Sequence, residues 1–207
     1  MRFHPGAKPE FVHHVESRLA TLRDELLRLF SGCAGPAVLE IGCGHGHFLS
    51  RYAHENPGHF CVGIDLLKDR LERAAKKRDR AKLANLHFVK TEAAEFLECL
   101  PREISFRSVF LLFPDPWPKK RHHKNRLVRA DFMAALAARM APGGQFYFRT
   151  DHAEYFEAGR AVLANHPAWQ IEPDVAWPCD EATVFQLKAD AYHSLTATVR
   201  THGQLTS

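Results

Sequence analysis

Three glycines and a carboxylate occur together in the stretch VLEIGCGHGHF, where a predicted strand runs into a predicted helix. Glu40 comes first, and Gly42, Gly44 and Gly46 follow at alternate positions. Glycines at such a turn let the backbone approach a ligand closely, and the start of the helix offers unpaired N–H groups. The turn is therefore predicted to bind a ligand, and the alternative is a tight strand-to-helix turn without one.

The spacing of these glycines and the charges near them indicate which ligand fits. The order is GxGxG, with His47 in place of the last glycine of the dinucleotide fingerprint GxGxxG. Glu40 would repel a pyrophosphate, so it favours a ligand with positive charge. Asp65, nineteen residues after Gly46, ends the next predicted strand and is placed to accept hydrogen bonds from two ribose hydroxyls. Glu92, after the third strand, is a carboxylate within reach of an adenine amino group.

A proline-rich acidic loop and a basic run follow the fourth predicted strand, in FPDPWPKKRHHKNR (113–126). Three prolines fix the backbone φ angles around Asp115 and Trp117, so these two side chains are held in place. The next eleven residues, 119–129, contain six Lys or Arg and two His. Such side chains can contact phosphates of a nucleic acid, and the alternative is a solvated start of a helix.

The elements that must position these residues alternate between strands and helices. Helices are predicted at 10–30, 48–55, 66–84, 92–100, 127–140 (closed by Pro142-Gly143-Gly144) and 152–165. Strands are predicted at 37–41, 59–64, 86–90, 107–113 and 145–150, with weaker candidates at 169–173 and 193–200. This alternation predicts a doubly wound α/β fold with a mostly parallel, seven-stranded sheet. Because ligands bind beyond the carboxyl ends of such strands, the glycine turn, Asp65 and the acidic loop are expected on one edge.

Length and composition favour a single domain over residues 1–207, with 1–34 as a helical segment that leads into it. Of the 207 residues, 45% are apolar, which is enough for a sizeable core, and the net charge of +4 is mild. Five scattered cysteines without a CxxC pair argue against disulfides and a cysteine zinc site. His122 and His123 have no third ligand at suitable spacing, so no metal is expected. Without a long apolar stretch or a signal peptide, no membrane association is expected and the protein is predicted to be cytoplasmic.

Two of these motifs resemble known families. The pattern ExGxGxG followed by a strand ending in Asp resembles the S-adenosylmethionine site of Rossmann-like methyltransferases, whose cofactor is cationic. The stretch FPDPWPKKRHHKNRLV resembles, nearly position for position, the signature of the bacterial tRNA (guanine-N7)-methyltransferases. The resemblance extends from about Val38 to Asp151, including GQFYFRTD. It implies S-adenosylmethionine as cofactor and the variable-loop guanosine of tRNA as substrate. The oligomeric state is left open, with a monomer as the working expectation.

The resemblance also implies roles for individual residues. Asp115 is implied as the catalytic residue, and Lys119 and Asp151 as substrate contacts. The RNA-facing residues are Arg121, His122, Lys124 and Arg126. Guanine N7 carries a lone pair and no proton, so methyl transfer needs alignment rather than a general base. Two roles stay open. Asp151 could instead be the N-cap of the helix at 152–165, and Trp117 is either an anchor of the loop or a platform on which a base stacks.

The C-terminal part departs from the family pattern. The aligned stretch TVFQLK places Thr183 and Gln186 in the substrate site, but Gln186 replaces the expected glutamate and a following glycine is absent. Asn125 also stands where the family generally has arginine. An amide offers guanine one acceptor where a carboxylate offers two. Two alternatives follow: a methyltransferase for an exocyclic or amide nitrogen of another substrate, or a non-catalytic subunit that binds cofactor or RNA.

Overall fold

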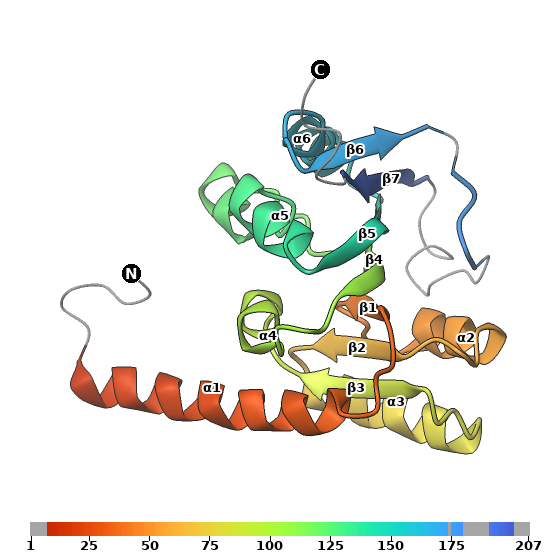
Figure 1. Cartoon of the computed structure of the whole chain (residues 1–207). Coiled ribbons are helices and arrows are strands. Elements are labelled where there is room, and N and C mark those ends of the chain that lie inside the picture. The colour runs from red at the N-terminus through yellow and green to blue at the C-terminus, as the bar shows by residue number, and fades with distance from the viewer. Residues whose placement is uncertain (1–7, 174, 180–190, 201–207) are drawn as a thin grey trace.

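The computed structural model describes residues 8–173, 175–179 and 191–200, and these residues build a seven-stranded sheet with helices on both faces (Figure 1). The strand order is β3-β2-β1-β4-β5-β7-β6. The strands are β1 (Ala37–Ile41), β2 (Cys61–Asp65), β3 (Leu86–Lys90), β4 (Phe106–Leu112), β5 (Met140–Thr150), β6 (Trp169–Glu172) and β7 (His193–Val199). Strands β1 to β5 pair in parallel, and β7 runs antiparallel to both β5 and β6. The expected doubly wound, mostly parallel fold is confirmed.

The order of the strands determines where a ligand can bind. From β1 the chain moves outward through β2 and β3, and β4 then returns to pair with the other side of β1. The connections after β1 and after β4 therefore diverge at their carboxyl ends, which is the switch point where such sheets bind ligands. All residues of β1 and β2 are buried, as expected for central parallel strands.

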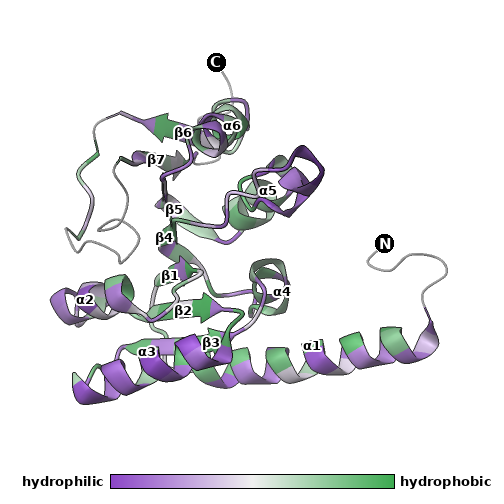
Figure 2. Ribbon diagram, turned by 180° about the vertical axis from the view of Figure 1, so that it is seen from behind, coloured by the Kyte–Doolittle hydropathy of each residue, from purple (hydrophilic) through white to green (hydrophobic). Residues whose placement is uncertain are grey.

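The helices cover the two faces of the sheet unequally (Figures 1 and 2). Helices α2 and α3 lie on one face, and α4 and α5 lie on the other, with the long α1 running beneath α4. On β1, Leu39 and Ile41 join the larger apolar core with α1, α4 and α5, while Val38 joins the smaller core under α2. The helices are α1 (Pro9–Phe30), α2 (His47–Glu55), α3 (Lys68–Arg80), α4 (Ala93–Cys99), α5 (Ala130–Ala137) and α6 (Ala153–Ala164).

Two predicted helices are shorter in the structure. Helix α3 starts only after Leu67, whose N–H donates to the Asp65 carboxylate, and it ends before Lys82, which has a left-handed φ of 54°. Helix α5 ends at Ala137, and Pro142-Gly143-Gly144 do not close it but lie within β5. The backbone there is used for sheet pairing, because Phe106 in β4 already pairs with Met140.

The structure also describes the cysteines and the helices that bear on possible membrane spans. All five cysteines are thiols, and four of them are buried. Across residues 8–173, 175–179 and 191–200, none of the helices combines the length and apolarity that crossing a membrane requires. Thr183 and Gln186 lie outside the described residues.

Candidate active site

A cavity of about 860 Å³ opens at the carboxyl ends of the central strands, at the switch point. Its walls come from the turns that follow β1, β2, β3 and β4, and from the start of α5. It brings together seven of the residues that the sequence singled out: Glu40, Gly42, Gly44, Asp65, Glu92, Asp115 and Lys124. The topology therefore joins the glycine turn, the ribose-binding candidate and the acidic loop in one space.

The glycine turn is shaped by its backbone. Gly42, Gly44 and Gly46 all have positive φ angles, of 74°, 52° and 65°, which glycine adopts without strain. Gly42 and Gly44 line the cavity, whereas Gly46 is the buried N-cap of α2 and does not line it. A Cβ at Gly46 would lie 2.8 Å from the Phe88 ring and 3.0 Å from the Cβ of Ala74. Gly46 is therefore required for close packing beneath the turn.

Asp65 links this turn to the next one. Its Oδ2 accepts a hydrogen bond from the Gly44 N–H at 2.9 Å, and its Oδ1 accepts one from the Leu67 N–H at 2.9 Å. The side chain is buried but borders the cavity. Each carboxylate oxygen keeps a second lone pair, so both can still accept hydrogen bonds from a ligand. The two backbone donors thus fix the orientation of a carboxylate whose remaining lone pairs are available to a diol.

Glu40 is the most unusual acid of the site. Its side chain is only 4% exposed, and its Oε2 has no hydrogen-bond partner within the described part of the chain. Burial raises the pKa of Glu40 to about 8, and the nearby Asp65 carboxylate adds to the rise, while a backbone hydrogen bond from Leu49 opposes it. A buried carboxyl oxygen without a donor is costly. A ligand that presents an N–H or ammonium group to Oε2 would satisfy it.

Glu92 and two leucines also line the cavity, from the segments that follow β3 and β2. Glu92 is the N-cap of α4, and its Oε2 accepts from the Glu95 N–H at 3.3 Å. Leu66 and Leu67 are 62% and 45% exposed, which is uncommon for neighbouring leucines outside an interface or a binding site. They line the cavity between Asp65 and α3. Sequence reasoning missed the leucines, although their place directly after the acid at the end of β2 was visible.

The acidic loop that follows β4 forms the other side of the cavity. Asp115 is exposed and borders the cavity together with Trp117, and both lie between residues with constrained backbones. Phe113 and Trp117 have left-handed φ angles of 49° and 46°, which side chains with a Cβ adopt only at a cost. The Trp117 ring meets the His122 ring edge to face at 5.8 Å. Trp117 is thus both held by the loop and exposed to the cavity.

The basic run forms a 3-10 helix, Lys120–Asn125, with no buried residue. Lys119, Arg121 and Lys124 are exposed and His122 is half-buried, and of these Lys124 lines the cavity. Arg126 differs, because it is 5% exposed and its guanidinium is engaged by the protein itself. The prediction that Arg126 faces RNA is corrected on this point, since its donors are turned inward.

Asp151 follows β5, is exposed, and does not line the cavity. The helix that follows is capped by His152, whose Nδ1 accepts the Tyr155 N–H at 3.2 Å. The alternative interpretation of Asp151 as N-cap is therefore wrong, because the helix begins one residue later than predicted. Its role toward a substrate stays a prediction.

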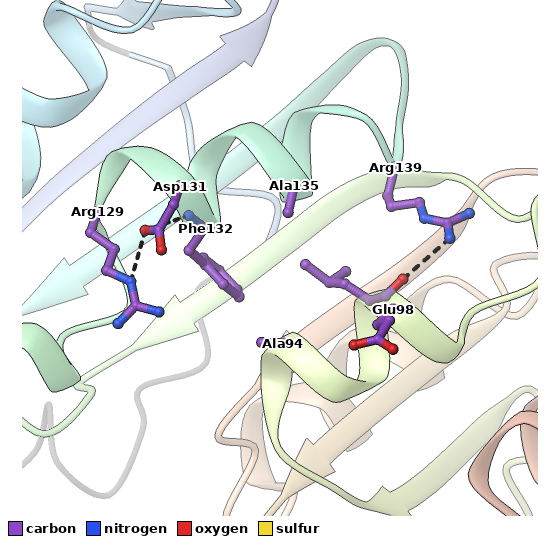
Figure 3. Close-up of a pocket in the computed structure, with 8 residues that line it drawn as sticks. Ala94, Glu98, Arg129, Asp131, Phe132, Ala135 and Arg139 are labelled. Atoms are coloured by element: carbon purple, nitrogen blue, oxygen red, sulfur yellow. Dashed lines mark hydrogen bonds and ion pairs between the residues drawn. The ribbon is translucent and has the colours of Figure 1, made fainter. Parts of the chain in front are cut away.

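A second, smaller hollow of about 420 Å³ lies between α4 and α5 (Figure 3). Figure 3 shows the Arg129 side chain turned toward Asp131, to which its Nε donates at 2.8 Å, and Arg139 turned toward α4. The two hollows share the side chains of Ala94, Arg129 and Phe132. Arg129 therefore stands between them, and together with Arg70 and Lys124 it brings positive charge to the border of the larger cavity.

The donors and acceptors of the cavity fit a cationic nucleoside. Glu40 supplies a buried acceptor without a donor, and Asp65 a fixed carboxylate for a diol. Leu66 and Leu67 offer an apolar surface for a base. Within the described ranges, no group of three or more His, Cys, Asp or Glu side chains could hold a metal ion.

Comparison with known proteins agrees with this assignment. The sequence model of a family described as "Putative methyltransferase" matches residues 34–192. A tRNA (guanine-N(7)-)-methyltransferase of Geobacter metallireducens is 42% identical over 125 residues, which cover 60% of this chain and 59% of that protein. Another of the same name, from Treponema pallidum, is 36% identical over 158 residues, covering 76% and 63%. One from Bordetella parapertussis is 36% identical over 182 residues, covering 79% and 72%. The chain thus spans about three fifths of the length of the first two of these relatives.

Solved structures with the same arrangement are more distant in sequence. The 16S rRNA methyltransferase KamB superposes with a TM-score of 0.62 at 20% identity, over 86% of this chain and 94% of that chain. A 16S rRNA (adenine(1408)-N(1))-methyltransferase of Catenulisporales acidiphilia, solved with its cosubstrate SAM, gives a TM-score of 0.56 at 18% identity, over 87% and 92%. These likenesses concern the fold, which is that of Rossmann-like methyltransferases.

Proposed function

The chain belongs to the bacterial tRNA (guanine-N7)-methyltransferase family, and on that basis we propose that it methylates N7 of a guanine in tRNA, with S-adenosylmethionine as cofactor. The variable-loop guanosine is the target by family resemblance. The observation that carries the proposal is the meeting of Glu40, Asp65 and Asp115 around one cavity. The first two carboxylates suit a cationic nucleoside, and the third suits a purine that becomes positively charged.

The residues on the glycine side bind and orient the cofactor. Asp65 accepts hydrogen bonds from the two ribose hydroxyls, and Glu92 accepts from the adenine amino group. The unpaired Oε2 of Glu40 accepts from the cationic amino acid end. When bound, the cofactor supplies an electrophilic methyl group on a sulfonium. The positive charge of the amino acid end close to Glu40 would favour the ionised carboxyl, so cofactor binding and deprotonation of Glu40 would be coupled.

The residues on the loop side position the acceptor. Guanine N7 attacks through its lone pair, so no side chain has to remove a proton from it before the transfer. Asp115 accepts hydrogen bonds from N1–H and N2–H of the guanine and stabilises the positive charge that develops on the ring. Trp117, at the border of the same cavity, offers an apolar surface to the base. The main contribution of the loop is alignment, because both side chains are held by a constrained backbone.

The basic residues around the loop bind the RNA backbone. Lys124 and Arg129 border the cavity, and Lys119, Arg121 and His122 extend this surface outward. Such contacts provide affinity and register rather than recognition of sequence. Asp151, Thr183 and Gln186 are proposed to contact the substrate. The cofactor and acceptor sides of the cavity come from one chain, in keeping with a monomer, and a tRNA-modifying enzyme is expected in the cytoplasm.

The experiment that tests this proposal is incubation with methyl-labelled S-adenosylmethionine and bulk tRNA, followed by nucleoside analysis. Label in 7-methylguanosine is the expected result. Label in another nucleoside would replace guanine N7 by another acceptor, such as an exocyclic nitrogen. The absence of label in tRNA, with cofactor binding intact, would contradict the proposal and favour another substrate or a non-catalytic binding role.

A further inference from the structure

The loop that carries Asp115 is held in a conformation that it would not adopt by itself. Phe113 and Trp117, on either side of it, have left-handed φ angles of 49° and 46°. Such angles are unfavourable for residues with a Cβ relative to the right-handed region. Strained residues of this kind persist only where surrounding contacts over-determine them. Some part of the fold must therefore stabilise the loop from outside.

Arg126 makes such a stabilising contact with the loop. Its Nε donates to the Pro116 carbonyl oxygen at 2.8 Å, one residue after Asp115. The same guanidinium lies over the Tyr155 ring, with its central carbon 4.8 Å from the ring centroid. Arg126 is 5% exposed, so its donors are shielded from solvent and from a bound RNA. A buried guanidinium that holds the backbone beside a catalytic candidate is a positioning group.

Glu154 in the first turn of α6 anchors this arginine. Its Oε1 and Oε2 accept from Nη1 and Nη2 of Arg126 at 2.9 and 2.6 Å, which is the bidentate geometry of a strong pair. Arg126 holds the pKa of Glu154 down at about 2, with His123 and His152 adding to the same effect. The carboxylate is thus ionised at neutral pH, and its charge also suits the N-terminal end of the helix.

Tyr155, the next residue on α6, holds the end of the basic run. Its hydroxyl oxygen accepts from the N–H groups of Leu127 and Val128 at 3.1 and 3.3 Å. Tyr155 is fully buried. The start of α6 therefore fixes both the loop, through Arg126, and the chain after the 3-10 helix, through the tyrosine.

We infer that the Arg126–Glu154 pair is a positioning device for catalysis, which sets the place of Asp115 by holding the Pro116 carbonyl from the first turn of α6. The inference rests on the proposed function only in that Asp115 is taken as the catalytic residue. It assigns Arg126 to the loop rather than to RNA, and it gives α6, which does not line the cavity, an indirect role in the reaction.

The test compares four variants by steady-state methylation of tRNA, by cofactor affinity and by tRNA affinity over a range of salt. Arg126→Met keeps the length of the side chain but removes its donors, and Glu154→Gln keeps the shape of the anchor. Lys124→Met removes an exposed basic residue of the same run. Glu157→Gln, which loses an exposed ion pair with Arg160 on the same helix, is the matched control.

The positioning role predicts a loss in kcat. For Arg126→Met, kcat falls by about 10²-fold, the cost of a displaced catalytic group, while the cofactor affinity stays within about twofold. For Glu154→Gln the fall is about tenfold, because an amide can still accept one of the two hydrogen bonds. Glu157→Gln stays at the wild-type rate. Lys124→Met instead weakens tRNA binding and lowers the slope of log affinity against log salt by about 0.7–0.9.

Two results would overturn the inference. In the first, Arg126→Met behaves like Lys124→Met: it binds tRNA more weakly, its tRNA affinity depends less on salt, and its kcat is unchanged. The other is found by hydrogen exchange, which needs no activity. If the variants position the loop less well, the amides between residues 117 and 128 exchange faster than in wild type and in Glu157→Gln. Unchanged exchange in both Arg126→Met and Glu154→Gln would reject the role.

The same measurement separates this inference from the proposed function. If the wild-type protein places no label at guanine N7, the function is wrong, and the exchange of residues 117–128 still decides whether the pair holds the loop. If label appears but the exchange and kcat of both variants match wild type, the function stands and the positioning role falls. If Arg126→Met does not fold, Glu154→Gln carries the test alone.

Discussion

The two sides of the cavity are built by different means. On the cofactor side, the turn after β1 is held by backbone groups: the N–H groups of Gly42 and Cys43 both donate to the Ile64 carbonyl oxygen, and Gly44 donates to Asp65. Its left-handed positions are glycines, which adopt them without strain. On the acceptor side, the left-handed positions are a phenylalanine and a tryptophan, and a distant arginine holds the loop.

Each side of the cavity keeps its geometry for a different physical reason. The glycine turn adopts its left-handed angles without strain, and hydrogen bonds from its N–H groups to the end of β2 hold it there. The acceptor loop is rigid because the side chains of Arg126 and Tyr155 hold it against α6. Removing one side chain should therefore loosen the acceptor side selectively, whereas adding a methyl group should damage the cofactor side.

The largest effect is expected from Asp115→Asn, which tests whether the two sides are functionally separate. The amide keeps the shape but loses the charge that stabilises the methylated purine, so kcat for tRNA should fall by about 10²–10³-fold. Cofactor affinity, measured by calorimetry, should stay close to wild type. Asp24→Asn, on the exposed surface of α1, is the control and should leave both quantities unchanged. A comparable loss of cofactor affinity would assign Asp115 to the cofactor side and break the comparison.

A smaller effect, on stability, is expected from Gly46→Ala. The added methyl group would meet the Phe88 ring at 2.8 Å with a left-handed backbone, so the free energy of unfolding should fall by about 2–4 kcal/mol. Gly42→Ala is the matched variant, because its φ is similar but nothing lies within 4 Å of the added group. It should cost only about 1–2 kcal/mol. Chemical denaturation measures both, and equal losses would show that close packing under the turn is unimportant.

The smallest effect concerns the pH dependence of stability through Glu40. Its pKa is raised from 4.5 to about 8 in the folded protein, so the folded state holds a proton that the unfolded state has lost between these values. The free energy of unfolding of the ligand-free protein should therefore decrease as pH rises from about 4.5 to about 8.

Glu40→Gln should remove this part of the pH dependence, which thermal or chemical unfolding at several pH values can measure. A saturating concentration of S-adenosylhomocysteine should also reduce it in wild type, because the ammonium group of that ligand favours the ionised carboxyl. A slope that is the same in wild type and Glu40→Gln would show that Glu40 ionises normally in the folded state.

Much of the cofactor side could be predicted from the sequence, since its determinants are local. Glu40, Gly42 and Asp65 each stand within one residue of the end of a strand, Gly44 and Gly46 follow within five residues, and the parallel topology then brings them to one edge. The limits of α3 and α5 were predicted less well. The Leu67 N–H donates to the Asp65 carboxylate, and the N–H groups of Leu127 and Val128 donate to the Tyr155 hydroxyl oxygen. Helical periodicity alone places these three residues inside the helices.

Residue types at short spacing are enough to predict the doubly wound fold, the glycine turn and the acidic loop. The inward orientation of Arg126 and its pairing with Glu154, twenty-eight residues later, depend on how the folded chain packs. An arginine in a basic run looks the same in sequence whether it faces solvent or protein. The choice depends on α6 packing beside the loop, which is a contact between distant segments that no local pattern encodes.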